Sequence, residues 1–139
     1  MNKQDIMAFK KELENYSYYK TNLQGTKKLI EYNEYLLENV HGVDPSKAPS
    51  GSGGGKVWVE TDTYHRISDE LERLRNRYAL RIAQISYIES ILDKLDPETK
   101  EMCIAIYVEG ETYATTTSGK HITSSGLFKR IERKLSKID

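Results

Sequence analysis

Basic residues gather near the carboxyl-terminal end of the 139-residue chain. The whole chain has a formal net charge of +0, so only a local surface can attract a polyanion. Between Lys120 and Ile138, Glu132 stands alone as an acid against six basic residues: Lys120, Lys129, Arg130, Arg133, Lys134 and Lys137. Basic side chains next to small polar ones suit contact with DNA phosphates and base edges.

The same stretch predicts a helix, because Thr123 is a suitable N-cap and apolar residues follow at spacings of three and four. Its predicted core face is Leu127, Phe128, Ile131, Leu135 and Ile138. The predicted DNA-binding residues are Thr123, Ser124, Ser125, Lys129, Arg130, Arg133 and Lys134. We expect Ser124, Ser125 and Lys129 to face bases and the last three to bind phosphates. The alternative is a solvated basic face that only complements the helix dipole.

No arrangement of residues predicts catalysis. His41, His65 and His121 are scattered, and none is spaced with Cys103 or a carboxylate as metal ligands are. Cys103 lies in an apolar run and is expected to be a core residue. We therefore expect a protein that is not an enzyme and needs no metal or other cofactor.

Capping residues divide the segment 96–139 into short helices. Asp96 followed by Pro97 predicts a helix start, and Gly110 predicts the end of that helix. Thr112 is positioned to cap a short element that begins at Tyr113. This segment is the predicted DNA-binding domain.

Residues 1–95 predict two long helices that pair as a coiled-coil-like antiparallel hairpin. In the first, a heptad repeat places Phe9, Tyr16, Leu23, Ile30 and Leu37 on one side, with a kink or break expected at Gly25. In the second, from residue 61 to 95, two heptad sets are apolar except at Arg81: Ile67, Leu74, Arg81, Ile88 and Leu95, and Tyr64, Leu71, Tyr78, Ile85 and Leu92. This seam needs a cover, which either the first helix or the same helix of another subunit supplies.

A Gly/Ser-rich stretch at about 41–56 predicts a flexible linker between these helices. It does not fit a phosphate-binding loop, because Val57 follows Lys56 where that motif needs Ser or Thr. Val57, Trp58 and Val59 have a strand-like composition, and Trp58 is expected to anchor on a helix surface.

The segment from Leu95 to Leu135 resembles the helix-turn-helix of sigma-factor region 4. The resemblance rests on Tyr107–Gly110, Thr112–Tyr113, Ile122–Thr123 and Arg130–Leu135, in that order. With the long helices and linker in front, the chain is similar to small phage regulators of the ArpU/RinA type. The resemblance implies an all-α fold and a sequence-specific activator of late packaging or lysis genes. Thr116–Thr117 and Lys120–His121 depart from the pattern, so the first helix of the motif is expected to be short or irregular.

Two other functions fit the same features: a small DNA-packaging component of the terminase small-subunit kind, and a polymerase-docking protein that binds no DNA. The expected partners are double-stranded DNA, RNA polymerase and a second copy of the chain.

With a single cysteine, no signal-peptide pattern and no long apolar run, we expect a cytoplasmic protein of a bacterial host cell that does not enter the membrane.

Overall fold

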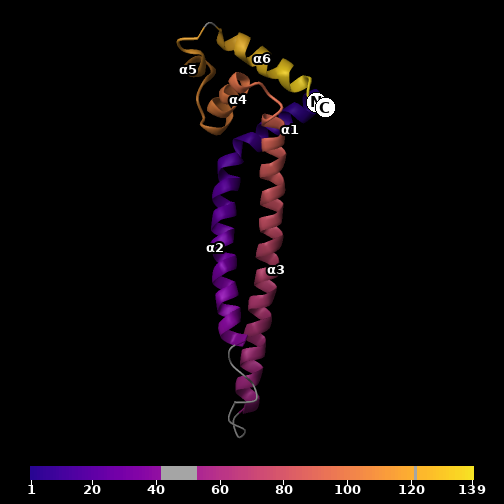
Figure 1. The fold of residues 1–139 in the computed structure, drawn as a ribbon, viewed down its shortest axis with the longest axis vertical. Helices are drawn as coiled ribbons and strands as arrows, with labels where there is room; N and C mark the ends of the chain where they lie inside the picture. Colours follow the sequence, from indigo (N-terminus) through magenta and orange to yellow (C-terminus); the bar gives the residue numbers. More distant parts are fainter. Residues whose placement is uncertain (42–52, 121) are drawn as a thin grey trace. The chain divides into compact units, whose positions relative to one another are not determined.

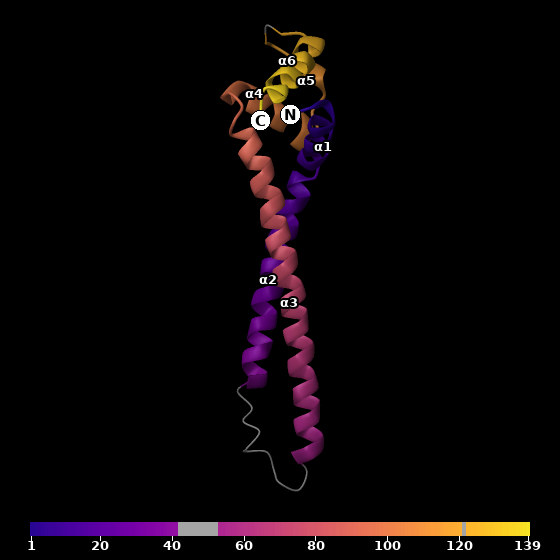
Figure 2. The same ribbon diagram turned by 90° about the vertical axis from the view of Figure 1, so that its right-hand side faces the viewer.

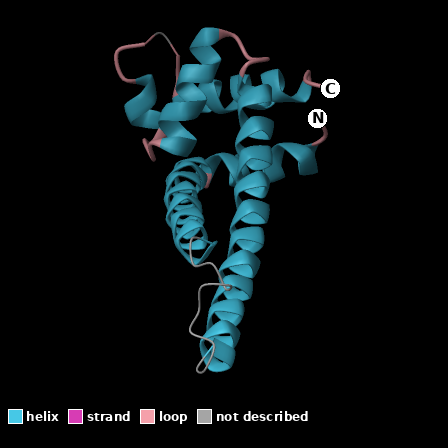
Figure 3. Cartoon of the chain, turned by 60° about the horizontal axis from the view of Figure 1, so that its bottom comes forward, coloured by secondary structure: helices cyan, strands magenta, loops and turns pink. Residues whose placement is uncertain are grey.

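A computed structural model describes residues 1–41, 53–120 and 122–139, and every regular element in them is helical (Figure 3). The predicted all-α class is confirmed. The elements are α1 (Lys3–Glu14), α2 (Tyr16–His41), α3 (Gly53–Leu92), α4 (Pro97–Cys103), the π-helical η2 (Ile104–Val108), α5 (Tyr113–Thr117) and α6 (Ser124–Ser136).

The predicted linker lies only partly within this description. Residues 42–52 are outside the described residues, whereas 53–56 already form the start of α3. Despite their strand-like composition, Val57–Val59 continue the same helix, in keeping with the predicted all-α class. The side chain of Trp58, and with it the expected anchor, lies outside the described side chains.

The chain divides into two compact units, and the division differs from the predicted boundary at residue 95. The terminal unit, named for its place in the sequence, comprises Met1–Thr21 and Ile82–Asp139. The middle unit comprises Asn22–Arg81. The terminal unit thus takes in α1, which packs against η2 and α6, together with the end of α3 from Ile82 onward.

The first long helix is interrupted at Asn15, and not at Gly25. Asn15 has φ −93° and ψ 2°, well away from helical values, and its N–H bonds to the carbonyls of Lys11 and Glu12. Gly25 lies within α2, and a Cβ there would meet no atom within 4 Å. The expected break at Gly25 is therefore wrong, because α2 continues through this residue.

In the middle unit, α2 and α3 lie side by side (Figures 1 and 2). Arg81 Nε donates to Asn22 Oδ1 at 2.8 Å, and Arg75 lies 3.4 Å from a carboxylate oxygen of Glu34. Leu71 and Leu74 of the predicted α3 seam are fully buried here, as is Thr26 of α2. Polar contacts of Arg81 and Arg75 thus join α3 to α2 within the middle unit.

The terminal unit has a core built from five of its helices. Fully buried side chains come from α1, α3, α4 and α6, and η2 adds the buried Ile106. Phe9 of α1 contacts Tyr87 of α3 edge to face, with ring centroids 6.3 Å apart. The fully buried apolar residues are Phe9, Leu13, Ile88, Met102, Cys103, Leu127, Ile131 and Leu135. This core holds the helices that carry the predicted DNA-binding residues.

Candidate nucleic-acid interface

The helix α6 begins at the predicted cap. Thr123 has an extended backbone, and its Oγ1 accepts the N–H of Gly126 at 3.0 Å. Gly126 fits closely beneath this cap, because a Cβ added to it would lie 2.9 Å from Thr123 Oγ1. Thr123 thus fixes the start of α6, a role that already occupies its hydroxyl.

One side of α6 is anchored in the core. Leu127, Ile131 and Leu135 are fully buried, and Ile138 beyond the helix end is also buried. Phe128, predicted to share this face, is 46% exposed, so that assignment is wrong. Its ring packs against Tyr113, with centroids 6.0 Å apart, and beneath the ammonium group of Lys10, 4.7 Å from the ring centroid. The ammonium group of Lys10 thus lies where the helical periodicity predicted contact with an apolar side chain.

The short helices before α6 follow their predicted caps. Asp96 accepts the N–H of Thr99 at the start of α4, and Thr112 accepts that of Thr115 at the start of α5. Gly110, which follows η2, has φ +76°, a left-handed conformation that suits glycine. α5 spans only five residues, which agrees with the expectation of a short helix there.

The threonines that depart from the family pattern are buried with hydrogen-bonded hydroxyl groups. Thr117 donates to the carbonyl oxygen of Tyr113 at 2.8 Å, and Thr116 donates to Glu111 Oε2 at 3.1 Å. These bonds let polar β-branched residues occupy the inner side of α5. Lys120 is exposed and follows Gly119, which has φ +74°, whereas His121 lies outside the described residues.

The predicted DNA-binding residues separate into two groups. Ser124, Ser125, Lys129 and Arg133 are exposed, as the prediction requires. Arg130 and Lys134 instead turn toward the start of α4. The guanidinium of Arg130 donates to Asp96 Oδ2 at 3.1 Å, Thr99 Oγ1 at 3.2 Å and Glu98 Oε2 at 3.3 Å, and Lys134 Nζ lies 3.6 Å from Asp96. In this conformation Arg130 is engaged within the chain and not presented to a phosphate.

The carboxylate of Asp96 is stabilised in its charged form by this arrangement. Its hydrogen bonds from Thr99, together with the nearby charges of Lys134 and Arg130, lower its pKa to about 2. The same carboxylate therefore caps α4 and ties α6 to it. The sequence predicted the cap but not the tie, because the two partners are 34 residues apart.

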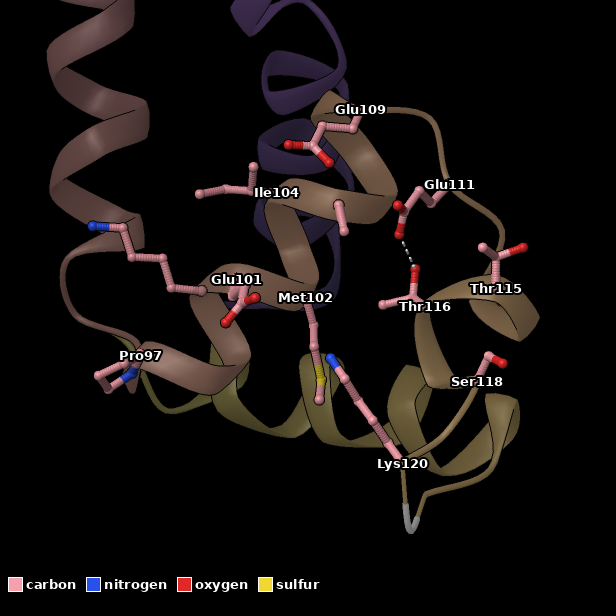
Figure 4. A pocket seen from close by; sticks show the side chains of 12 residues that line it. Pro97, Glu101, Met102, Ile104, Glu109, Glu111, Thr115, Thr116, Ser118 and Lys120 are labelled. Carbon is pink, nitrogen blue, oxygen red and sulfur yellow. Dashed lines mark hydrogen bonds between the residues drawn. The ribbon is translucent and has the colours of Figure 1, made fainter.

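An acidic groove of about 570 Å³ lies beside this interface, between the α4–η2 segment and α5 (Figure 4). Glu101, Glu109 and Glu111 line it, with Met102 toward its floor and Lys120 at one side (Figure 4). Lys100 also lines the groove, so its three carboxylates stand beside two lysines.

Other side chains that could take part in chemistry have structural roles. Cys103 is fully buried, and burial raises the pKa of its thiol to about 12, so it is protonated at neutral pH. Burial also raises the pKa of Tyr113, whose hydroxyl contacts that of Tyr107. Among the described residues, no group of His, Cys, Asp and Glu side chains could hold a metal ion. Within the same residues, no helix is long and apolar enough to cross a membrane.

The chain matches no protein-family model, and no curated protein or solved structure was found to match it.

Proposed function

We propose that this protein is a sequence-specific DNA-binding regulator of transcription that inserts α6 into the major groove. The observation that carries this proposal is the division of α6 into two sides. Leu127, Ile131 and Leu135 hold one side in the core, while Ser124, Ser125, Lys129 and Arg133 are exposed on the other. A helix fixed by its apolar side, with small polar residues at its start and cations further along, suits base and phosphate contact.

The elements before α6 fit the supporting part of a helix-turn-helix. α4 with η2, α5 and α6 follow one another closely, and α5 and α6 pack against each other. In the proposed arrangement, α5 crosses the DNA backbone and α6 is the recognition helix. The resemblance to sigma region 4 implies these roles for the two helices.

The contacts within the chain refine the proposed roles of the basic residues. Ser124, Ser125 and Lys129 contact base edges, and Arg133 binds a phosphate. Arg130 and Lys134 hold α6 against Asp96 and so set the angle at which it enters the groove. Exposed Lys120 adds a phosphate contact before the helix.

The long helices supply the second part of the proposal. α2 and α3 form an antiparallel hairpin that contacts RNA polymerase or another copy of the chain. By its resemblance to ArpU/RinA-type regulators, the protein activates late phage genes for packaging or lysis.

The test starts with a pull-down of fragmented bacterial and phage DNA by the full-length protein, followed by sequencing. For a recovered fragment, Lys129→Ala combined with Arg133→Ala should weaken binding by about 100-fold, since each lost contact costs on the order of 1–3 kcal/mol. Fluorescence anisotropy over a range of salt concentrations measures this loss, and the slope against salt should also become shallower.

The matched control is Lys20→Ala combined with Lys27→Ala, which removes two exposed lysines from α2. This variant should bind like the wild type. Failure to recover any DNA, or equal affinity of the α6 variant and the wild type, would contradict DNA binding through α6. A protein that captures polymerase but no DNA would instead be the docking protein considered above.

A further inference from the structure

The helix α2 carries a second apolar stripe in addition to the one that faces α3. Gly25, Leu29, Tyr32 and Leu36 follow one another at spacings of four, three and four residues, the pattern of a coiled-coil seam. Leu29 is 48% exposed and Tyr32 is 58% exposed. The fully buried Thr26 lies about a quarter turn around the helix, on the side that faces α3, so the two stripes are distinct.

We infer that this stripe is a self-association seam that pairs with α2 of a second copy of the chain in an antiparallel arrangement. This inference concerns the middle unit alone and does not depend on DNA binding. The proposed pair has a two-fold axis between residues 30 and 31. The spacings of the stripe residues are the same in both directions from that point, so each residue of one copy lies opposite a stripe residue of the other.

In this register, the smaller residue of each pair lies opposite the larger one. Gly25 of each copy lies opposite Leu36 of the other, and Leu29 lies opposite Tyr32. The space above Gly25 is open, since a Cβ there would meet nothing within 4 Å, so it can receive the leucine of the second copy. Interfaces of this isologous kind require that one patch complement itself.

Charged residues beside the stripe are complementary in the same register. Lys28 and Glu31 are both exposed and lie on the same flank of the stripe. In the antiparallel pair, Lys28 of one copy lies within one helical turn, along the axis, of Glu31 of the other, so the two side chains on this flank carry opposite charges. The stripe from Gly25 to Leu36 spans about 17 Å at 1.5 Å per residue.

Sedimentation of the full-length protein without DNA tests the inference. We expect a concentration-dependent equilibrium between monomer and dimer. Leu29→Glu should raise the dimer dissociation constant by about 100-fold or more, because it places a charge at the centre of the seam. Lys27→Glu is the matched control: it places the same carboxylate on the same helix outside the stripe and should leave the equilibrium nearly unchanged. Circular dichroism verifies that both variants remain helical.

Cross-linking tests the register. Under oxidising conditions, a mixture of Gly25→Cys chains and Leu36→Cys chains should form a disulfide-linked dimer, whereas neither variant should link to itself. The native Cys103 is fully buried and does not compete. A monomer at all concentrations up to about 100 µM, or a dimer unaffected by Leu29→Glu, would overturn the seam. Linking of Gly25→Cys to itself would overturn the antiparallel register.

Discussion

The terminal and middle units differ in how many of their described side chains are fully buried. The terminal unit buries large side chains from α1, α3, α4 and α6 around one core. In the part of the middle unit whose side chains are described, the fully buried ones are Thr26, Leu71 and Leu74. That unit also exposes Leu29, Tyr32, Tyr35 and Leu80.

The proposed function requires that α6 be held at a fixed angle, and the terminal core anchors one side of this helix. A pair of long helices has few layers to bury and gains stability when another helix covers it. We therefore expect the terminal unit to tolerate core substitutions poorly and the middle unit to respond most to changes in association.

The largest expected effect is in the terminal core. Ile131→Ala should lower the free energy of unfolding by about 2–5 kcal/mol, since the side chain is fully buried and its removal leaves a cavity. Phe128→Ala, on the same helix but half-exposed, should cost clearly less. Urea unfolding followed by circular dichroism measures both. Equal losses for the two variants would show that α6 is not anchored by the side that we describe.

Local signals in the sequence predicted much of this unit. Asp96, Thr112 and Thr123 cap helices as expected, because a cap depends on residues two or three positions away. The core positions Leu127, Ile131 and Leu135 also follow from spacing alone. Their periodicity is set by helix geometry, whatever the partner.

Features that depend on distant residues were not predictable. The periodicity of α6 did not distinguish the half-exposed Phe128 from its buried neighbours, nor did it predict the contact of its ring with Lys10 of α1. Arg130 was assigned to phosphate on charge, although its partners lie on α4. Helix α1 was assigned to the hairpin because nothing near Asn15 signals that α1 turns toward η2 and α6. These contacts are tertiary, and no local pattern encodes them.

A smaller effect is expected from the ion pairs of Arg130 with Asp96 and Glu98, which join α6 to the start of α4. Arg130→Gln should lower stability by about 1–2 kcal/mol, because it removes charge-assisted bonds to a partly buried group. Lys129→Gln, which changes an exposed residue one position earlier, should change stability little. Thermal unfolding of both variants provides the measurement, and a loss no larger for Arg130→Gln than for Lys129→Gln would remove Arg130 from its positioning role.

The smallest expected effect is the pH dependence of the stability that the Asp96 carboxylate contributes. The folded pKa of Asp96, about 2, is below its ordinary value of 3.8, so protons bind more readily in the unfolded chain. The stabilisation from the Asp96 carboxylate is therefore fully present above about pH 4 and is lost as the pH falls toward 2. Unfolding curves of the wild type and Asp96→Asn should differ at pH 6 and converge across this window. Convergence would show that the charged form of Asp96, held first by Thr99 and then by Lys134 and Arg130, carries the stabilisation, whereas a constant difference would assign the effect of Asp96 to packing alone.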